Sequence, residues 1–108
     1  MIITFKKPTK IDGKEIKSIT LDFDSMNGRK LIAAEKEARL RGNTLLNPLH
    51  ASLEGQAIVA AQASGWKVDD IEDLDGPDFM EVTGQVSLFL NGLTLPEITP
   101  SETSEKQS

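Results

Sequence analysis

An Asp-Gly pair at Asp12 and Gly13, between two segments of alternating residues, is the feature that most restricts the fold of this chain. In residues 2–7 and 15–23, large apolar side chains alternate with threonine, lysine and aspartate, which is the period of a half-buried β-strand. A tight two-residue turn needs positive φ at both central positions, and Asp-Gly tolerates this. The pattern predicts an N-terminal antiparallel β-hairpin over about residues 2–23.

The register of this hairpin predicts an irregularity. With a regular two-residue turn, the apolar side chains of the two strands would lie on opposite faces of the hairpin. A one-residue bulge near Pro8 or Ile16 would bring them to one face. The bulge would then pair Phe5 with Ile19 or Leu21, so we expect a bulged hairpin.

Helical spacing of apolar residues dominates the rest of the chain. It predicts three main α-helices over about residues 26–41, 48–64 and 76–92, with a single further turn near residues 68–74. A hairpin followed by helices is an α+β fold. The capping and terminating residues that we expect are Ser25 or Asn27, Gly42, Asn47 with Pro48, Gly65, and Asp75 or Gly76.

Composition bounds the size of the folded part. With 108 residues, 38% of them apolar, the chain can build one modest core, and we expect a single domain over residues 1–95. Residues 96–108 hold two prolines, three glutamates and one large apolar residue, which predicts a disordered acidic tail. There is no cysteine, no apolar run close to the ~20 residues of a membrane span, and no signal-peptide pattern. These features favour a cytoplasmic protein without a membrane partner.

Charge is unevenly distributed along the sequence. The chain carries a net charge of -5, with an excess of basic residues up to Arg41 and a strong acidic excess after it. An acidic total argues against nucleic-acid binding, which depends on neutralising phosphates. The hairpin lysines keep a nucleic-acid module only as a third hypothesis. The asymmetry also allows head-to-tail contact between copies, so homo-oligomers are an expectation.

Residues for catalysis are scarce. The only histidine is His50, and neither a glycine-rich phosphate loop nor a G-x-S-x-G motif occurs. The acidic segment from Asp69 to Glu81 has a few residues in the pattern of a calcium loop, but Ile71 and Val82 fall where ligands are required. We therefore predict that the protein is not an enzyme and has no cofactor and no metal site.

The segment predicted as the third helix is apolar over more than the usual width. Its main stripe has two interpretations, a face packed in the core or an exposed strip for a partner or a second copy. The stripe consists of the apolar residues at helical spacing, Phe79, Val82, Val86, Phe89, Leu90 and Leu93. Met80 and Leu88 lie off that stripe. The general tendency of such stripes to pack in the core favours the first interpretation, and the exposed strip is the alternative.

The stretch MNGRKLIAAEKEARLRG, from Met26 to Gly42, resembles a pattern of tail assembly chaperones of long-tailed bacteriophages. The order of the other parts is similar too: an early Lys-Pro, an Asp-Gly turn, ITLDF, AIVAAQASGW, DDIEDLDGPDFMEVTGQVSLFL and a polar tail. The resemblance covers most of residues 2–93. Lys30 departs from it, because an acidic residue is more expected after the glycine.

The resemblance implies a protein that binds the long helical tape measure protein in the host cell cytoplasm, without enzymatic activity. It would keep this client soluble until tail tube protein, a second expected partner, polymerises around it, and would not be retained in the mature virion. The family also implies two product lengths made by ribosomal slippage, this chain being the short one. The alternative is a small non-enzymatic adaptor or inhibitor of a phage or host protein. Contact with a helical client would use apolar residues at helical spacing, and the candidates are Leu53, Ala57, Ala61, Val82, Val86, Phe89, Leu90 and Leu93.

Overall fold

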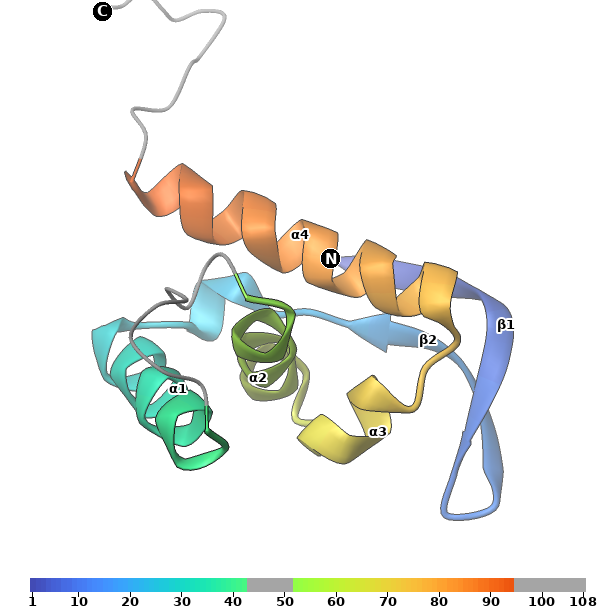
Figure 1. Cartoon of the computed structure of the whole chain (residues 1–108). Helices are drawn as coiled ribbons and strands as arrows, with labels where there is room; N and C mark the ends of the chain where they lie inside the picture. The colour runs from blue at the N-terminus through green and yellow to red at the C-terminus, as the bar shows by residue number, and fades with distance from the viewer. Residues whose placement is uncertain (43–51, 95–108) are drawn as a thin grey trace, which may run out of the picture.

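The computed structural model describes residues 1–42 and 52–94, and these confirm the α+β prediction. A long hairpin occupies one end of the molecule, and the last helix lies along the top with the other helices beneath it (Figure 1). The elements are β1 (Ile2–Ile11), β2 (Lys14–Thr20), the short 3-10 helix η1 (Phe23–Ser25), α1 (Gly28–Leu40), α2 (Leu53–Ser64), α3 (Val68–Glu72) and α4 (Gly76–Thr94).

The hairpin turns at Asp12 and Gly13 as predicted, with φ of 54° and 80° at these residues. The predicted bulge is also present, and it is larger than one residue. Thr4 pairs with Ser18 and Thr9 with Ile16, so the four residues 5–8 of β1 stand opposite a single residue of β2. The predicted partner of Phe5 was wrong, because Ile3 is the residue that pairs with Ile19.

A buried carboxylate explains the size of the bulge. Asp78, on α4, is fully buried, and its two carboxylate oxygens accept hydrogen bonds from the backbone N–H groups of Lys6 and Lys7, at 2.9 and 3.0 Å. These donors face α4 instead of β2, so β1 bends out of the ladder there. The bulge and the start of α4 are therefore parts of one contact.

α2 is the central helix and is shorter than predicted. The expected start near residue 48 was wrong, because Ser52 is the extended N-cap residue and its hydroxyl accepts from the N–H of Gly55 at 2.8 Å. Asn47 and Pro48, on which the earlier start depended, lie outside the described residues, as does His50. The predicted end is confirmed, with Gly65 in the left-handed conformation.

The other boundaries agree with the sequence to within a few residues. Asn27 caps α1 by accepting from the N–H of Lys30 at 3.0 Å, and Gly42, with φ of 95°, follows its end. β2 ends at Thr20, before the predicted residue 23. Phe23 has left the strand direction in η1, and its ring stacks on Phe89 of α4, with centroids 4.5 Å apart.

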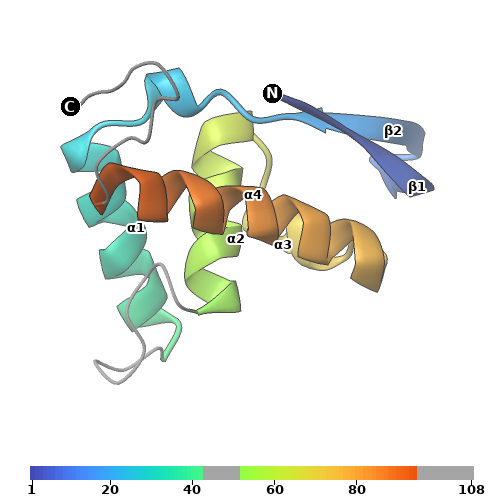
Figure 2. The ribbon, with the colours of Figure 1, turned by 90° about the horizontal axis from the view of Figure 1, so that it is seen from above.

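The core lies where α4 crosses α2 and approaches β1, and Figure 2 shows this crossing from above. α2 has neighbours on several sides, so eight of its twelve residues are buried, many of them small enough for close helix approach. The buried apolar residues are Ile3, Phe5, Ile19, Leu21, Ala34, Ala38, Ala57, Ile58, Val59, Ala60, Ala61, Ala63, Ile71, Leu74, Val82, Val86 and Leu90.

Candidate protein-binding surfaces

Most residues predicted to contact a partner belong to the core. Five of them are buried, and Phe89 is partly buried against Phe23. The side chains of the five buried residues pack in the core, where α4 turns its apolar stripe toward α2 and β1. Of the remaining two, Leu53 is 48% exposed, and the side chain of Leu93 lies outside the described part. The five buried residues are Ala57, Ala61, Val82, Val86 and Leu90.

The opposite face of α4 carries exposed apolar side chains. Met80 is 54% exposed and Leu88 is 66% exposed, and Gly84 lies between them at helical spacing. Residues four apart share one face of a helix, so the three form a continuous line, here called the outer strip. No other group lies within 4 Å of where a side chain at Gly84 would begin, so the strip has an open gap between two large residues. This arrangement suits a helix whose side chain enters the gap.

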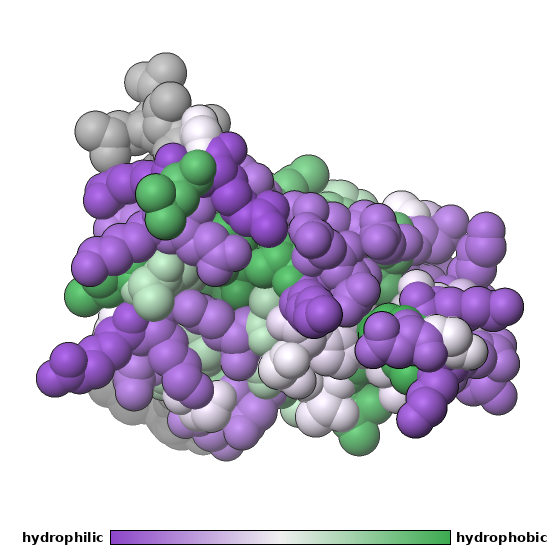
Figure 3. All heavy atoms as spheres, turned by 90° about the horizontal axis from the view of Figure 1, so that it is seen from below, coloured by the Kyte–Doolittle hydropathy of each residue, from purple (hydrophilic) through white to green (hydrophobic). Residues whose placement is uncertain are grey.

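Exposed apolar residues also occur away from α4. Ile32 and Leu40 on α1 are more than half exposed, as are Met1 and Ile2 at the N-terminus. Seen from below, hydrophilic atoms cover most of the surface and apolar atoms form small separate patches (Figure 3). These scattered residues need no functional explanation, but they provide matched controls for the outer strip.

On another side of the molecule, the side chain of Arg41 forms ion pairs with residues of α1, α2 and α3. Arg41 follows α1, and its guanidinium lies 3.2 to 3.6 Å from four carboxylates. Desolvation of the guanidinium lowers the pKa of Arg41. The nearby carboxylates raise the pKa by more than desolvation lowers it, so it lies above its ordinary value. The cluster fixes the end of α1 against α2 and α3. Its acidic members are Glu37, Glu54, Asp69 and Glu72.

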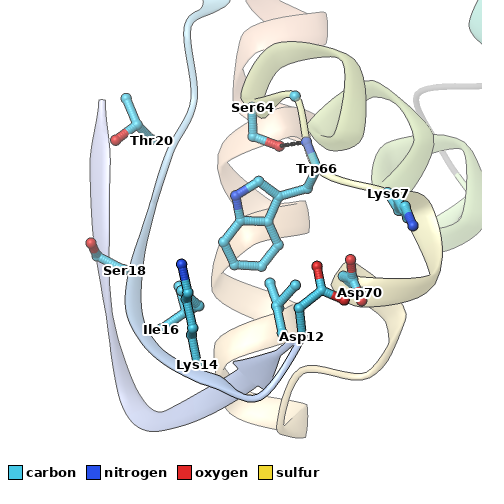
Figure 4. Close-up of a pocket in the computed structure, with 11 residues that line it drawn as sticks. Asp12, Lys14, Ile16, Ser18, Thr20, Ser64, Trp66, Lys67 and Asp70 are labelled. Carbon is cyan, nitrogen blue, oxygen red and sulfur yellow. Dashed lines mark hydrogen bonds between the residues drawn. The ribbon is translucent and has the colours of Figure 1, made fainter.

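A groove of about 580 Å³ separates β2 from the junction of α2 and α3. The indole of Trp66 lies in it, with Ser64 and Asp70 on the helical side and residues of the hairpin on the other (Figure 4). Trp66 makes an edge-on contact with Phe5, with centroids 6.0 Å apart, and its backbone N–H donates to the hydroxyl of Ser64 at 3.1 Å. Trp66 is partly buried, so a neighbouring molecule can reach the ring.

Residues 1–42 and 52–94 contain neither a metal-ligand cluster nor a membrane-spanning helix. That part of the chain holds no group of three or more histidine, aspartate or glutamate side chains placed to hold a metal ion. It also holds no helix of the length and apolarity needed to span a bilayer.

Sequence reasoning missed two contributors, Asp78 and Trp66. Asp78 lies in the first turn of α4, where the helix dipole favours an acid, and nothing in the sequence indicates that it binds backbone donors of the hairpin. Trp66 was given no role, and an isolated tryptophan just after a helix-ending glycine was the available signal. Met80 and Leu88 were noted as lying off the stripe, but they were not among the candidate contact residues, and the structure shows both exposed.

Comparison with known proteins agrees with the resemblance drawn from the sequence. The model of the family described as phage tail assembly chaperone proteins, E, or 41 or 14, matches residues 2–91. Neither the curated proteins nor the solved structures gave a match. Since the family model covers most of the 108 residues, the chain belongs to the phage tail assembly chaperone family.

Proposed function

We propose that this chaperone binds the tape measure protein, keeps it soluble, and holds it until tail tube protein polymerises around it. Family membership supports a role in tail assembly and therefore protein partners. The role needs binding and release, and no catalytic step. In this proposal the chaperone acts in the host cell cytoplasm and is not retained in the mature virion.

The outer strip is the observation that supports this function best. Met80 and Leu88 stand more than half exposed on a helix whose other face is fixed in the core. A rigid helix presenting two large apolar side chains around a glycine can pack against an amphipathic helix of a client. We therefore place the client contact on the outer strip, and the buried candidates hold α4 in position.

Co-expression tests the function directly. A helical segment of the tape measure protein that is insoluble alone should remain soluble when the full chaperone is produced with it, and the two should co-purify. An unrelated aggregation-prone helical protein serves as the control for general solubilisation. If the segment is equally insoluble with and without the chaperone, the proposed function is wrong.

A further inference from the structure

The groove beside Trp66 has one wall formed by a strand edge, and the pairing of the hairpin defines which groups that edge presents. Met1 and Leu21 exchange two backbone hydrogen bonds, of 3.0 Å (Met1 N to Leu21 O) and 2.7 Å (Leu21 N to Met1 O). In an antiparallel pair such bonded positions alternate with positions whose backbone groups point outward. Thr20 and Ser18, opposite Ile2 and Thr4, are therefore outward positions.

Asp22 is the next residue after Thr20 whose backbone groups point away from β1, and its hydrogen-bond partner shows which way this edge of β2 faces. The N–H of Asp22 donates to the carbonyl of Ala63, near the end of α2, at 2.9 Å. The edge of β2 therefore points toward the end of α2, and Ser18 and Thr20 both line the groove. The structure shows no hydrogen bond from their outward backbone groups to another described element. Open strand edges of this kind pair readily with an added strand.

The charged residues that line the groove indicate which kind of side chain an added strand would carry. Asp12 and Asp70 come from the hairpin turn and from α3, and Figure 4 shows both carboxyl groups at the lower end of the groove, below the indole. Neither carboxylate has an ion-pair partner among the described residues. Two lysines also line the groove. In this view the ammonium of Lys67 points away from the ring, and that of Lys14 lies on the hairpin side, across from the two carboxyl groups. A cationic side chain placed there meets two carboxylates and an aromatic ring.

We propose that the groove is a second binding site, which takes an extended peptide segment of a partner protein carrying lysine or arginine. The segment pairs with the outward backbone groups of Ser18 and Thr20 as a third strand. Its basic side chain lies against Trp66 and between Asp12 and Asp70. At about 3.3 Å per residue, the edge from Ser18 to Thr20 spans only about 7 Å, so recognition depends on a short strand and one side chain.

This site differs from the outer strip in element, chemistry and the conformation of its partner. The outer strip suits an apolar helix, whereas the groove suits an extended basic segment. The two sites therefore allow the chaperone to hold a helical client and a second protein segment at the same time. Because the two surfaces lie on different elements, loss of client binding at α4 would leave peptide binding in the groove unchanged.

Trp66 is the only tryptophan of the chain, so its signals report directly on the groove. The test uses the full ¹⁵N-labelled chain and capped heptapeptides of alternating threonine and valine that differ only in the central residue. Arginine or lysine at the centre should shift the amide signals of Ser18 and Thr20 and the indole signal of Trp66. Glutamate at the centre should bind at least fivefold more weakly, as should an arginine peptide with methylated backbone nitrogens.

Variants of the two acids give the matched comparison. Asp12→Asn and Asp70→Asn should each weaken arginine-peptide binding roughly fivefold, the upper value for an exposed ion pair. Asparagine also tolerates the positive φ at position 12. Glu15→Gln, on β2 but outside the groove lining, removes the same charge and should leave binding unchanged. Equal responses to arginine and glutamate peptides, absence of binding at millimolar concentration, or a Trp66 signal that changes with protein concentration alone would overturn the proposal.

Discussion

The carboxylate of Asp78 on α4 and the backbone N–H of Lys6 on β1 form a hydrogen bond 2.9 Å long between residues 72 positions apart. The second oxygen of Asp78 accepts from Lys7. Through this contact the bulge in the hairpin fixes the start of α4. The direction of the outer strip therefore depends on the N-terminal strand.

Replacing Asp78 by alanine should lower the free energy of unfolding by about 3 kcal/mol, because two charge-assisted bonds are lost and two backbone donors become unsatisfied. Chemical denaturation measures this value. Glu81→Ala removes an exposed acid one turn further along α4 and serves as the control. Equal stability of the two variants would show that the Asp78 contact does not fix the hairpin to α4.

Val86→Asp should abolish the native fold. Val86 is fully buried in the core, and an unpaired charge there costs several kcal/mol, comparable with the whole stability of a small domain. Far-UV circular dichroism and a thermal melt should show a largely unfolded chain. A cooperative melt close to that of the wild type would contradict the placement of this α4 face in the core.

Arg41→Met should reduce stability by about 1 to 2 kcal/mol, since four carboxylates lose their shared cation and each exposed pair contributes up to ~1 kcal/mol. The difference from wild type should shrink as salt is added. Arg39→Met is the matched control, because among the described residues Arg39 pairs only with Glu35, an exposed acid on the same helix. A difference that does not change with salt would mean that Arg41 acts through packing of its aliphatic part.

The uneven charge predicts self-association that depends on ionic strength. Exposed lysines on the hairpin, such as Lys10 and Lys17, can approach the acidic surface around Glu72 and Asp73 of a second copy. At ~0.5 M salt the Debye length is only about 4 Å, so such contacts should weaken. Light scattering across a salt series measures the change. Oligomers of the same size at every salt concentration would exclude charge as the cause.

Elements set by local sequence were predictable. The turn at Asp12-Gly13, the cap at Asn27 and the helix end at Gly65 follow from backbone preferences of single residues, and the structure has all three. The existence of the bulge followed from the period of two along the strands. Its size did not follow, because it depends on Asp78, far away in the sequence.

The candidate site was only partly predictable for a similar reason. Helical spacing identified the apolar faces of α4, but a stripe has the same pattern whether it meets α2 or a client. The tertiary arrangement decides this, and it places Val86 inside and Leu88 outside. The groove was not predictable at all, since it joins the edge of β2 to Trp66 and Asp70 through the path of the hairpin.

Binding of the tape measure segment by outer-strip variants tests the central claim most directly. Leu88→Asp and Met80→Asp change exposed positions and should remain folded by circular dichroism. Leu40→Asp is the matched control, because Leu40 is 88% exposed on α1, away from the strip. If the outer strip holds the client, Leu88→Asp should lower the affinity at least tenfold by calorimetry, while Leu40→Asp binds like the wild type. Folded Leu88→Asp and Met80→Asp variants that bind with unchanged affinity would contradict the account.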